Sequence, residues 1–135
     1  MARLIYAAIT SLDGYMSDLS DPDADAEWSV PTREVFSAVL DLERPIGTYL
    51  YGRRMYETMA LWETAHLDAG APAFTPGLLD LERDFAALWR AADKIVFSTT
   101  LTRASTPRTR IERGVDPAET RRLKAASERD LTVGG

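Results

Sequence analysis

The chain has 135 residues, of which 45% are hydrophobic, and it carries a formal net charge of -5. This length suits one globular domain with one core, and the acidic balance argues against a general nucleic-acid-binding surface. The absence of cysteine excludes disulfides and thiolate metal sites, and we expect no metal centre. No apolar run approaches the roughly 20 residues that span a membrane, so we expect a cytoplasmic protein.

The first predicted strand covers residues 4–10, an almost continuous apolar run. Because the run does not alternate with polar residues, we expect both of its faces to be buried, as in a central strand of a parallel or mixed sheet. The turn signal Asp13-Gly14 follows it. Residues 18–27 are rich in acids but lack the glycine and the closing glutamate of a calcium-binding EF-hand loop, so we interpret them as a solvated loop.

A helix and then a strand-helix unit come next. The helix is predicted from about residue 32 to 43, and Pro45 stops it. Residues 46–51 are β-branched, aromatic and aliphatic, which predicts a buried strand. Gly52 breaks this strand, and apolar residues at helical spacing predict an amphipathic helix at 53–62.

Arg53 and Arg54 stand at the start of that last helix, directly after Gly52. A helix N-terminus presents free N–H groups and a partial positive charge. Two arginines there, after a glycine that allows close backbone approach or a positive φ, form a plausible phosphate cradle. The alternative is a tight turn with two solvated arginines, and the residues alone leave both interpretations open.

The second half of the chain continues the alternation. Glycines and prolines mark residues 63–77 as a loop. The remaining predicted elements are a helix at 78–92, strands at 94–98 and 109–112, a helix at 116–129 and a strand at 131–133. Strands that alternate with helices predict an α/β domain with a largely parallel sheet.

In such sheets ligands bind beyond the carboxyl ends of the strands. Four of these ends, at residues 11–14, 52–54, 98–100 and 134–135, carry small, hydroxylated or basic residues that suit a polar anionic ligand. The dinucleotide fingerprint Gly-x-Gly-x-x-Gly is absent after the first strand, and so is a Walker A motif. A standard Rossmann domain is therefore disfavoured.

The motifs at these ends resemble those of the dihydrofolate reductase-like family. The order and spacing are closest to the reductase domain of the bifunctional riboflavin-biosynthesis deaminase/reductase and its small stand-alone bacterial relatives. The motifs are Ser11-Leu-Asp-Gly14, Leu50-Tyr-Gly-Arg-Arg-Met-Tyr-Glu57, Lys94-Ile-Val-Phe-Ser98 and Thr132-Val-Gly-Gly135. The resemblance covers residues 1–135 as a single domain and implies a three-layer α/β fold that binds NADPH across the strand ends.

The resemblance also implies roles for particular residues. Gly52, Arg53 and Arg54 would hold the 2′-phosphate and the pyrophosphate, Ser98 and Thr99 would lie along the adenosine, Gly134 and Gly135 would begin the pyrophosphate loop, and Leu12, Asp13 and Gly14 would flank the nicotinamide. Arginine suits a phosphate because its planar fork can donate to two oxygens at once.

Three features depart from the family pattern. Met55 replaces a threonine that dihydrofolate reductases usually place in the phosphate site. Glu34 is the nearest candidate for the carboxylate that grips a pterin, and it joins Asp13 as a candidate catalytic residue, although Asp-Gly is also favourable turn chemistry. Relatives continue beyond the glycine pair, so we expect the C-terminal helix and strands of the family to be absent. Either the chain then forms a homodimer through its first strand or the surface beside it, or the native protein is longer than this sequence.

Several other residues are expected to be structural. We interpret His66 as an exposed loop residue rather than a catalytic acid, and the run Arg121-Arg122-Lys124 as a solvated helix face. Trp28, Trp62 and Trp89 are expected to be packing residues, with Trp28 bordering the substrate cleft.

These observations favour an NADPH-dependent reductase that transfers a hydride to a small heteroaromatic or carbonyl substrate, such as a pterin- or pyrimidine-like molecule. The alternative is a protein that binds a nucleotide or another small molecule without turnover. A structural or interaction module is a third possibility, and it would bind no nucleotide.

Overall fold

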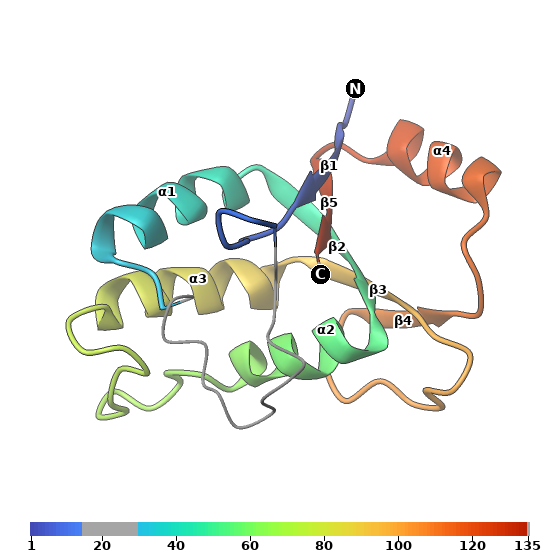
Figure 1. The fold of residues 1–135 in the computed structure, drawn as a ribbon. Helices are drawn as coiled ribbons and strands as arrows, with labels where there is room; N and C mark the ends of the chain where they lie inside the picture. Colours follow the sequence, from blue (N-terminus) through green and yellow to red (C-terminus); the bar gives the residue numbers. More distant parts are fainter. Residues whose placement is uncertain (15–29, 135) are drawn as a thin grey trace.

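The computed structural model of the chain describes residues 1–14 and 30–134, and it has an α/β architecture (Figure 1). The elements are, in chain order, β1 (Leu4–Ala7), α1 (Arg33–Glu43), β2 (Ile46–Gly52), α2 (Arg53–Met59), the 3₁₀ helix η2 (Ala60–Glu63), α3 (Leu79–Ala91), β3 (Asp93–Phe97), β4 (Thr109–Glu112), α4 (Pro117–Ala126) and β5 (Asp130–Gly134). The predicted alternation of strands and helices is confirmed.

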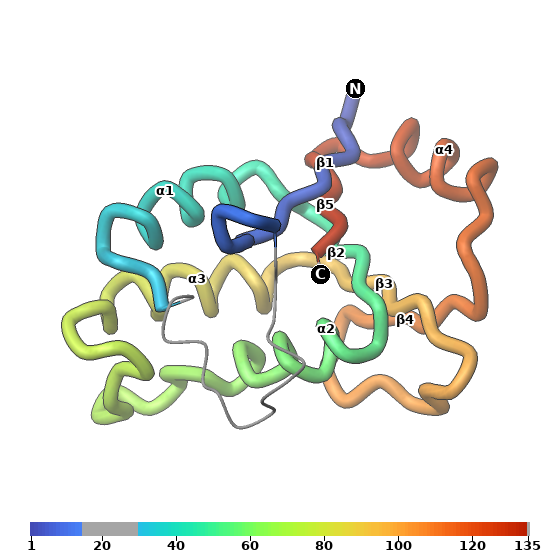
Figure 2. Tube along the Cα trace, in the orientation of Figure 1, coloured from blue at the N-terminus to red at the C-terminus, as the bar shows by residue number. Residues whose placement is uncertain are grey.

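The five strands form one sheet in the order β1-β5-β2-β3-β4, and every neighbouring pair is parallel. The last strand lies between the first strand and β2, so the first and the last strand of the chain lie side by side (Figure 2). Because all strands run the same way, all their carboxyl ends lie along one edge of the sheet. The register puts Gly134 between Ala7 and Tyr51, and it puts Gly52 beside Phe97.

The sheet is covered on both faces, which gives three layers. Helices α1, α2 and α3 lie on one side and α4 on the other (Figure 1). The first face contributes Tyr49, Tyr51 and Val96 to the larger core cluster, together with Trp89 of α3. Trp89 is fully buried, and its Nε1 donates a hydrogen bond to the Tyr51 hydroxyl at 3.1 Å. The second face forms a smaller cluster against α4.

Local sequence signals set the helix starts. Thr32 caps α1 by accepting a hydrogen bond from the N–H of Val35 at 3.4 Å. Asp116 caps α4 by accepting from the N–H of Ala118 at 2.8 Å, and Pro117 takes the first helical position. The starts of both helices agree with the predicted ranges, although α4 ends at Ala126 rather than near residue 129.

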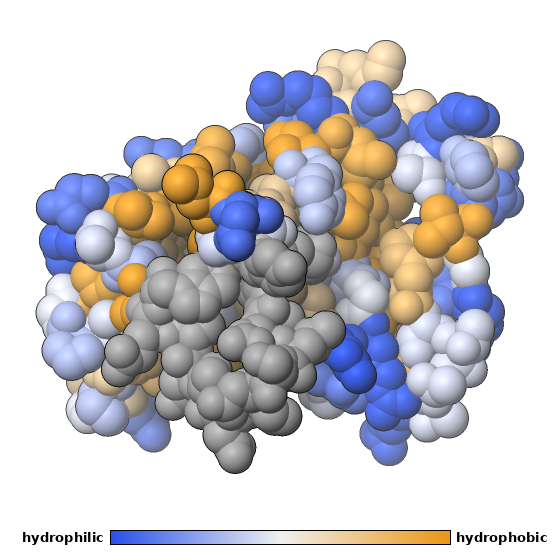
Figure 3. All heavy atoms as spheres, in the orientation of Figure 1, coloured by the Kyte–Doolittle hydropathy of each residue, from blue (hydrophilic) through white to orange (hydrophobic). Residues whose placement is uncertain are grey.

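The position of β1 corrects one prediction. The strand is four residues long and lies at the edge of the sheet, where Leu4 and Tyr6 are 41% and 67% exposed. Among the described residues, β5 is the only strand that pairs with it. The apolar run is therefore not a central strand with two buried faces, and hydrophobic residues gather on the near face of the molecule over β1 and β5 (Figure 3).

The environment of His66 corrects a second prediction. Its side chain is only 2% exposed, and its ring contacts those of Trp62 and Phe74. Its Nε2 lies 2.9 Å from an oxygen of Glu82, although it is not aligned for a hydrogen bond. The Glu82 carboxylate also accepts hydrogen bonds from the N–H groups of Phe74 and Thr75, at 2.9 and 2.8 Å. The loop thus folds back onto α3 and buries the histidine.

Other predictions have mixed outcomes. Trp62 and Trp89 pack in the core as predicted, and Arg121 and Arg122 are exposed on α4. Trp28, Gly135 and the acidic loop at 18–27 lie outside the described residues. No helix in the described part of the chain is long and apolar enough to cross a membrane.

Candidate functional site

The carboxyl edge of the sheet brings together three of the four predicted strand ends. Gly134 ends β5, residues 52–54 join β2 to α2, and residues 98–100 follow β3. The fourth predicted segment, residues 11–14, follows β1 only after residues 8–10, so it lies further from the sheet along the chain. A cluster of strongly hydrophilic residues lies over the start of α2 (Figure 3).

The two arginines at the start of α2 have different environments. Arg53 donates from Nε to the Glu57 carboxylate at 2.8 Å and from Nη1 to the Thr100 hydroxyl at 3.0 Å. Within the described residues its Nη2 has no partner, and the exposed Arg54 guanidinium has none at all. Arg53 is therefore held in place with one nitrogen available, whereas Arg54 is free. Because α2 has only seven residues, the guanidinium groups carry the positive charge of this site.

Residues 98–101 form a tightly bonded turn beside Arg53. The Ser98 hydroxyl accepts from the N–H groups of Thr100 and Leu101, at 3.2 and 3.0 Å. Arg113, which directly follows β4, donates from Nη1 to the carbonyls of Ser98 and Leu101 at 3.0 and 2.6 Å. The predicted residue Thr99 is exposed in this turn. Arg113 carries no local sequence signal, because only the pairing of β3 with β4 brings it beside Ser98.

The three described glycines among the predicted site residues differ in backbone conformation and in the space around them. Gly52 has φ of -74°, which any residue can adopt, and a Cβ there would meet no atom within 4 Å. The suggestion that Gly52 adopts a positive φ is therefore wrong. A Cβ on Gly134 would lie 3.0 Å from a ring carbon of the buried Tyr51, so close packing requires this glycine. Gly14 has φ of +92° and its N–H donates to Ser11 at 3.0 Å, which closes the predicted turn.

Met55 packs against the core cluster and is partly buried. The position where the resembled family usually places a hydroxyl therefore contributes packing, and the charged groups beside it are Arg53 and Arg54.

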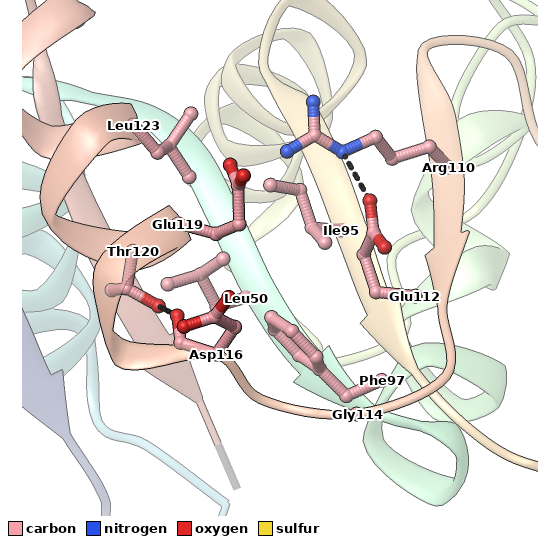
Figure 4. A pocket seen from close by; sticks show the side chains of 10 residues that line it. All are labelled: Leu50, Ile95, Phe97, Arg110, Glu112, Gly114, Asp116, Glu119, Thr120 and Leu123. Atoms are coloured by element: carbon pink, nitrogen blue, oxygen red, sulfur yellow. Dashed lines mark hydrogen bonds and ion pairs between the residues drawn. The ribbon is translucent and has the colours of Figure 1, made fainter.

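A cavity of about 330 Å³ lies between α4 and the second face of the sheet (Figure 4). Its lining combines apolar and charged side chains: Leu50, Ile95, Phe97 and Leu123 are apolar, Gly114 and Thr120 are small, and Arg110, Glu112, Asp116 and Glu119 are charged. In Figure 4 the apolar side chains come from the strands and from α4, and one dashed line joins Nε of Arg110 to a carboxylate oxygen of Glu112, 3.3 Å away.

The cavity adjoins the arginine site through consecutive residues. Phe97 lines the cavity, and the next residue, Ser98, begins the turn that contacts Arg53 through Thr100. Glu112 and Gly114 line the cavity on either side of Arg113. An apolar surface bordered by carboxylate acceptors suits a flat ring that carries an amino group. Sequence analysis did not predict this cavity, which is built from four separate elements.

The two candidate catalytic acids are both exposed. The Asp13 carboxylate accepts a hydrogen bond from the Ser11 hydroxyl at 2.5 Å. Glu34 lies in the first turn of α1, where hydrogen bonds from its own N–H and from Thr32 lower the pKa of its carboxyl. Burial raises the pKa of Glu43, but this residue precedes β2 and lies near the opposite end of that strand.

No protein-family model matches this chain, and no curated protein matches it significantly. The similarity to the dihydrofolate reductase-like family therefore rests on the quoted motifs.

Proposed function

We propose that the chain is an NADPH-dependent reductase with a dihydrofolate reductase-like fold, which reduces a small heteroaromatic or carbonyl substrate. The observation that carries this proposal is that the turn bonded to Arg53 directly follows the cavity-lining residue Phe97 at the carboxyl end of β3. An anion site next to an amphipathic cavity is the combination that an adenosine 2′-phosphate requires.

The phosphate would bind to the arginine pair. Arg54 is free to donate a two-pronged pair of hydrogen bonds, and Arg53 offers Nη2 from a guanidinium already fixed by Glu57 and Thr100. A side chain that is fixed before binding loses less conformational entropy when the ligand arrives. Charge-assisted hydrogen bonds of this kind contribute roughly 1.5–3 kcal/mol each.

The adenine ring would enter the cavity. Its faces would contact apolar side chains such as Ile95 and Phe97, and carboxylates at the rim would accept hydrogen bonds from its amino group. The dinucleotide would then run along the carboxyl ends of the strands past Gly134, which ends β5 and is partly exposed. When bound, the cofactor would supply the hydride, and the protein would orient the two reactants and exclude water.

The second candidate function is nucleotide binding without turnover. It is favoured by the environments of the two candidate acids, because both are exposed and the pKa of Glu34 is lowered rather than raised. A proton donor that works near neutral pH usually has a raised carboxyl pKa.

Titration of NADPH and NADH, followed by tryptophan fluorescence, tests the proposal. We expect NADPH to bind at least about tenfold more tightly, which is the effect of one charge-assisted hydrogen bond. Arg54→Ala should lose most of this preference, whereas Arg121→Ala, which removes an exposed arginine of α4, should keep it. Equal affinities of the wild-type chain for the two cofactors would refute the proposal.

Cofactor oxidation in the presence of pterins, pyrimidines and quinones then separates the two candidates. Oxidation with any of these substrates supports the reductase. Tight and selective NADPH binding without oxidation in the whole panel would favour binding without turnover.

A further inference from the structure

One guanidinium outside the proposed phosphate site is joined to it by a continuous set of hydrogen bonds. We propose that Arg113 is a positioning residue, which sets the selectivity of the site for a 2′-phosphate by holding the 98–101 turn and, through it, Arg53. This inference rests on the proposed function, because it concerns how the same site distinguishes nucleotides.

The first step is the contact between Arg113 and the turn. A single nitrogen, Nη1, donates to both the Ser98 and the Leu101 carbonyl, at 3.0 and 2.6 Å, so the two ends of the turn are held together. The N–H of Ser98 also donates to the carbonyl of Glu112 at 2.9 Å. The residues at the end of β4 therefore fix the turn from both its backbone N–H and its carbonyl groups.

The second step is the contact between the turn and Arg53. The hydroxyl of Ser98 lies 3.3 Å from that of Thr100, and Thr100 accepts from Arg53 at 3.0 Å. Glu57 holds Nε of the same guanidinium at 2.8 Å. If the turn moves, Arg53 keeps only its bond to Glu57, which belongs to the same helix and does not fix the guanidinium relative to the sheet.

The chemistry of arginine explains why this position uses a guanidinium. Its planar group has five donors in a fixed geometry, so Arg113 can hold two carbonyls at one end and keep the rest of the group solvated. Lysine could reach one carbonyl but would not hold both with the same geometry. Arg113 is exposed and lies between the cavity-lining residues Glu112 and Gly114, so it joins the cavity to the arginine site.

The test compares two mononucleotide probes, adenosine 2′,5′-bisphosphate and 5′-AMP, which differ only in the 2′-phosphate. The quantity measured is the dissociation constant of 5′-AMP divided by that of adenosine 2′,5′-bisphosphate, so a high ratio means selectivity for the 2′-phosphate. We expect Arg113→Ala to lower this ratio about tenfold, the loss of one well-placed charge-assisted hydrogen bond, and Arg113→Lys to give an intermediate ratio. Arg121→Ala is the control for the lost charge and should keep the wild-type ratio.

A double-mutant cycle separates positioning from direct contact. If Arg113 acts through Arg53, then Arg113→Ala lowers the ratio in the wild-type background and leaves it unchanged in an Arg53→Ala background. An unchanged ratio in Arg113→Ala would overturn the inference, and so would an equal fall in both backgrounds, which would indicate direct phosphate contact. If the wild-type chain itself does not distinguish the two probes, the proposed function fails. Failure of the proposed function can therefore be told apart from failure of the inference about Arg113.

Discussion

The hydroxyl of Tyr56 provides a quantitative test of the packing around the candidate site. Tyr56 is 1% exposed on α2, and its hydroxyl accepts hydrogen bonds from the N–H groups of Ser105 and Thr106 at 3.0 and 3.1 Å. It also lies 2.8 Å from the Thr106 hydroxyl and 3.2 Å from that of Ser105. Burial raises the pKa of Tyr56, but the hydrogen bonds outweigh burial and lower the pKa below its ordinary value.

Tyr56→Phe keeps the ring and removes only the hydroxyl. Thr106 is buried, so leaving its N–H without a partner should cost about 1–3 kcal/mol. Ser105 is exposed, so water can replace the lost bond and the cost should be about 0.5–1.5 kcal/mol. We therefore expect Tyr56→Phe to lower the free energy of unfolding by about 1.5–4.5 kcal/mol.

Urea denaturation measures this change. The transition midpoint should fall while the m value stays the same, because the surface exposed on unfolding does not change. Thr58→Ala, on the exposed side of the same helix, is the control and should stay within about 0.5 kcal/mol of wild type. A Tyr56→Phe variant as stable as this control would refute the argument that the hydroxyl holds the 105–106 segment.

Three further predictions concern Glu43, Glu82 and Gly134. Burial raises the pKa of the Glu43 carboxyl. The contribution of this group to stability is therefore present below the unfolded pKa of about 4.3 and is lost as the pH rises through the folded pKa. Thermal unfolding should show Glu43→Gln to be more stable than wild type at neutral pH and equal to it below about pH 4. Glu82→Ala should cost about 3–5 kcal/mol in urea denaturation and speed hydrogen exchange at the two loop N–H groups that it binds; unchanged exchange would contradict this role. Gly134→Ala should cost about 1–3 kcal/mol in urea denaturation, because its Cβ would meet the buried ring of Tyr51. Gly52→Ala should leave stability almost unchanged, because its Cβ would meet no atom. A larger loss of stability in Gly52→Ala than in Gly134→Ala would contradict both expectations.

Local signals predicted the elements of this fold well. The Asp116-Pro117 start of α4 and the strand before Gly52 are determined by residues that are close in the chain, so capping and periodicity identify them. The place of a strand in the sheet is set by its neighbours instead. The apolar run of β1 therefore predicted a strand correctly, but the central position that it also predicted is wrong.

In the candidate site, too, some features follow from local sequence signals and others from residues that are distant in the chain. Parallel pairing was predicted from the alternation of elements, and it implied that residues 52–54 and 98–100 lie at one edge. The cavity, the bonds of Arg113 and the burial of His66 depend on side chains that are distant in sequence, such as His66 with Glu82. No local pattern records such contacts, so they required the structure.

The central claim is that an adenine nucleotide binds along the carboxyl edge of the sheet and into the cavity beside β3. Amide NMR spectra recorded during a titration with NADPH test it most directly. The account predicts that the largest shifts occur at residues 52–54 and 97–100 and at Gly114, with little change in the loop around His66. Shifts confined to that loop, or no shifts at saturating NADPH, would contradict the account.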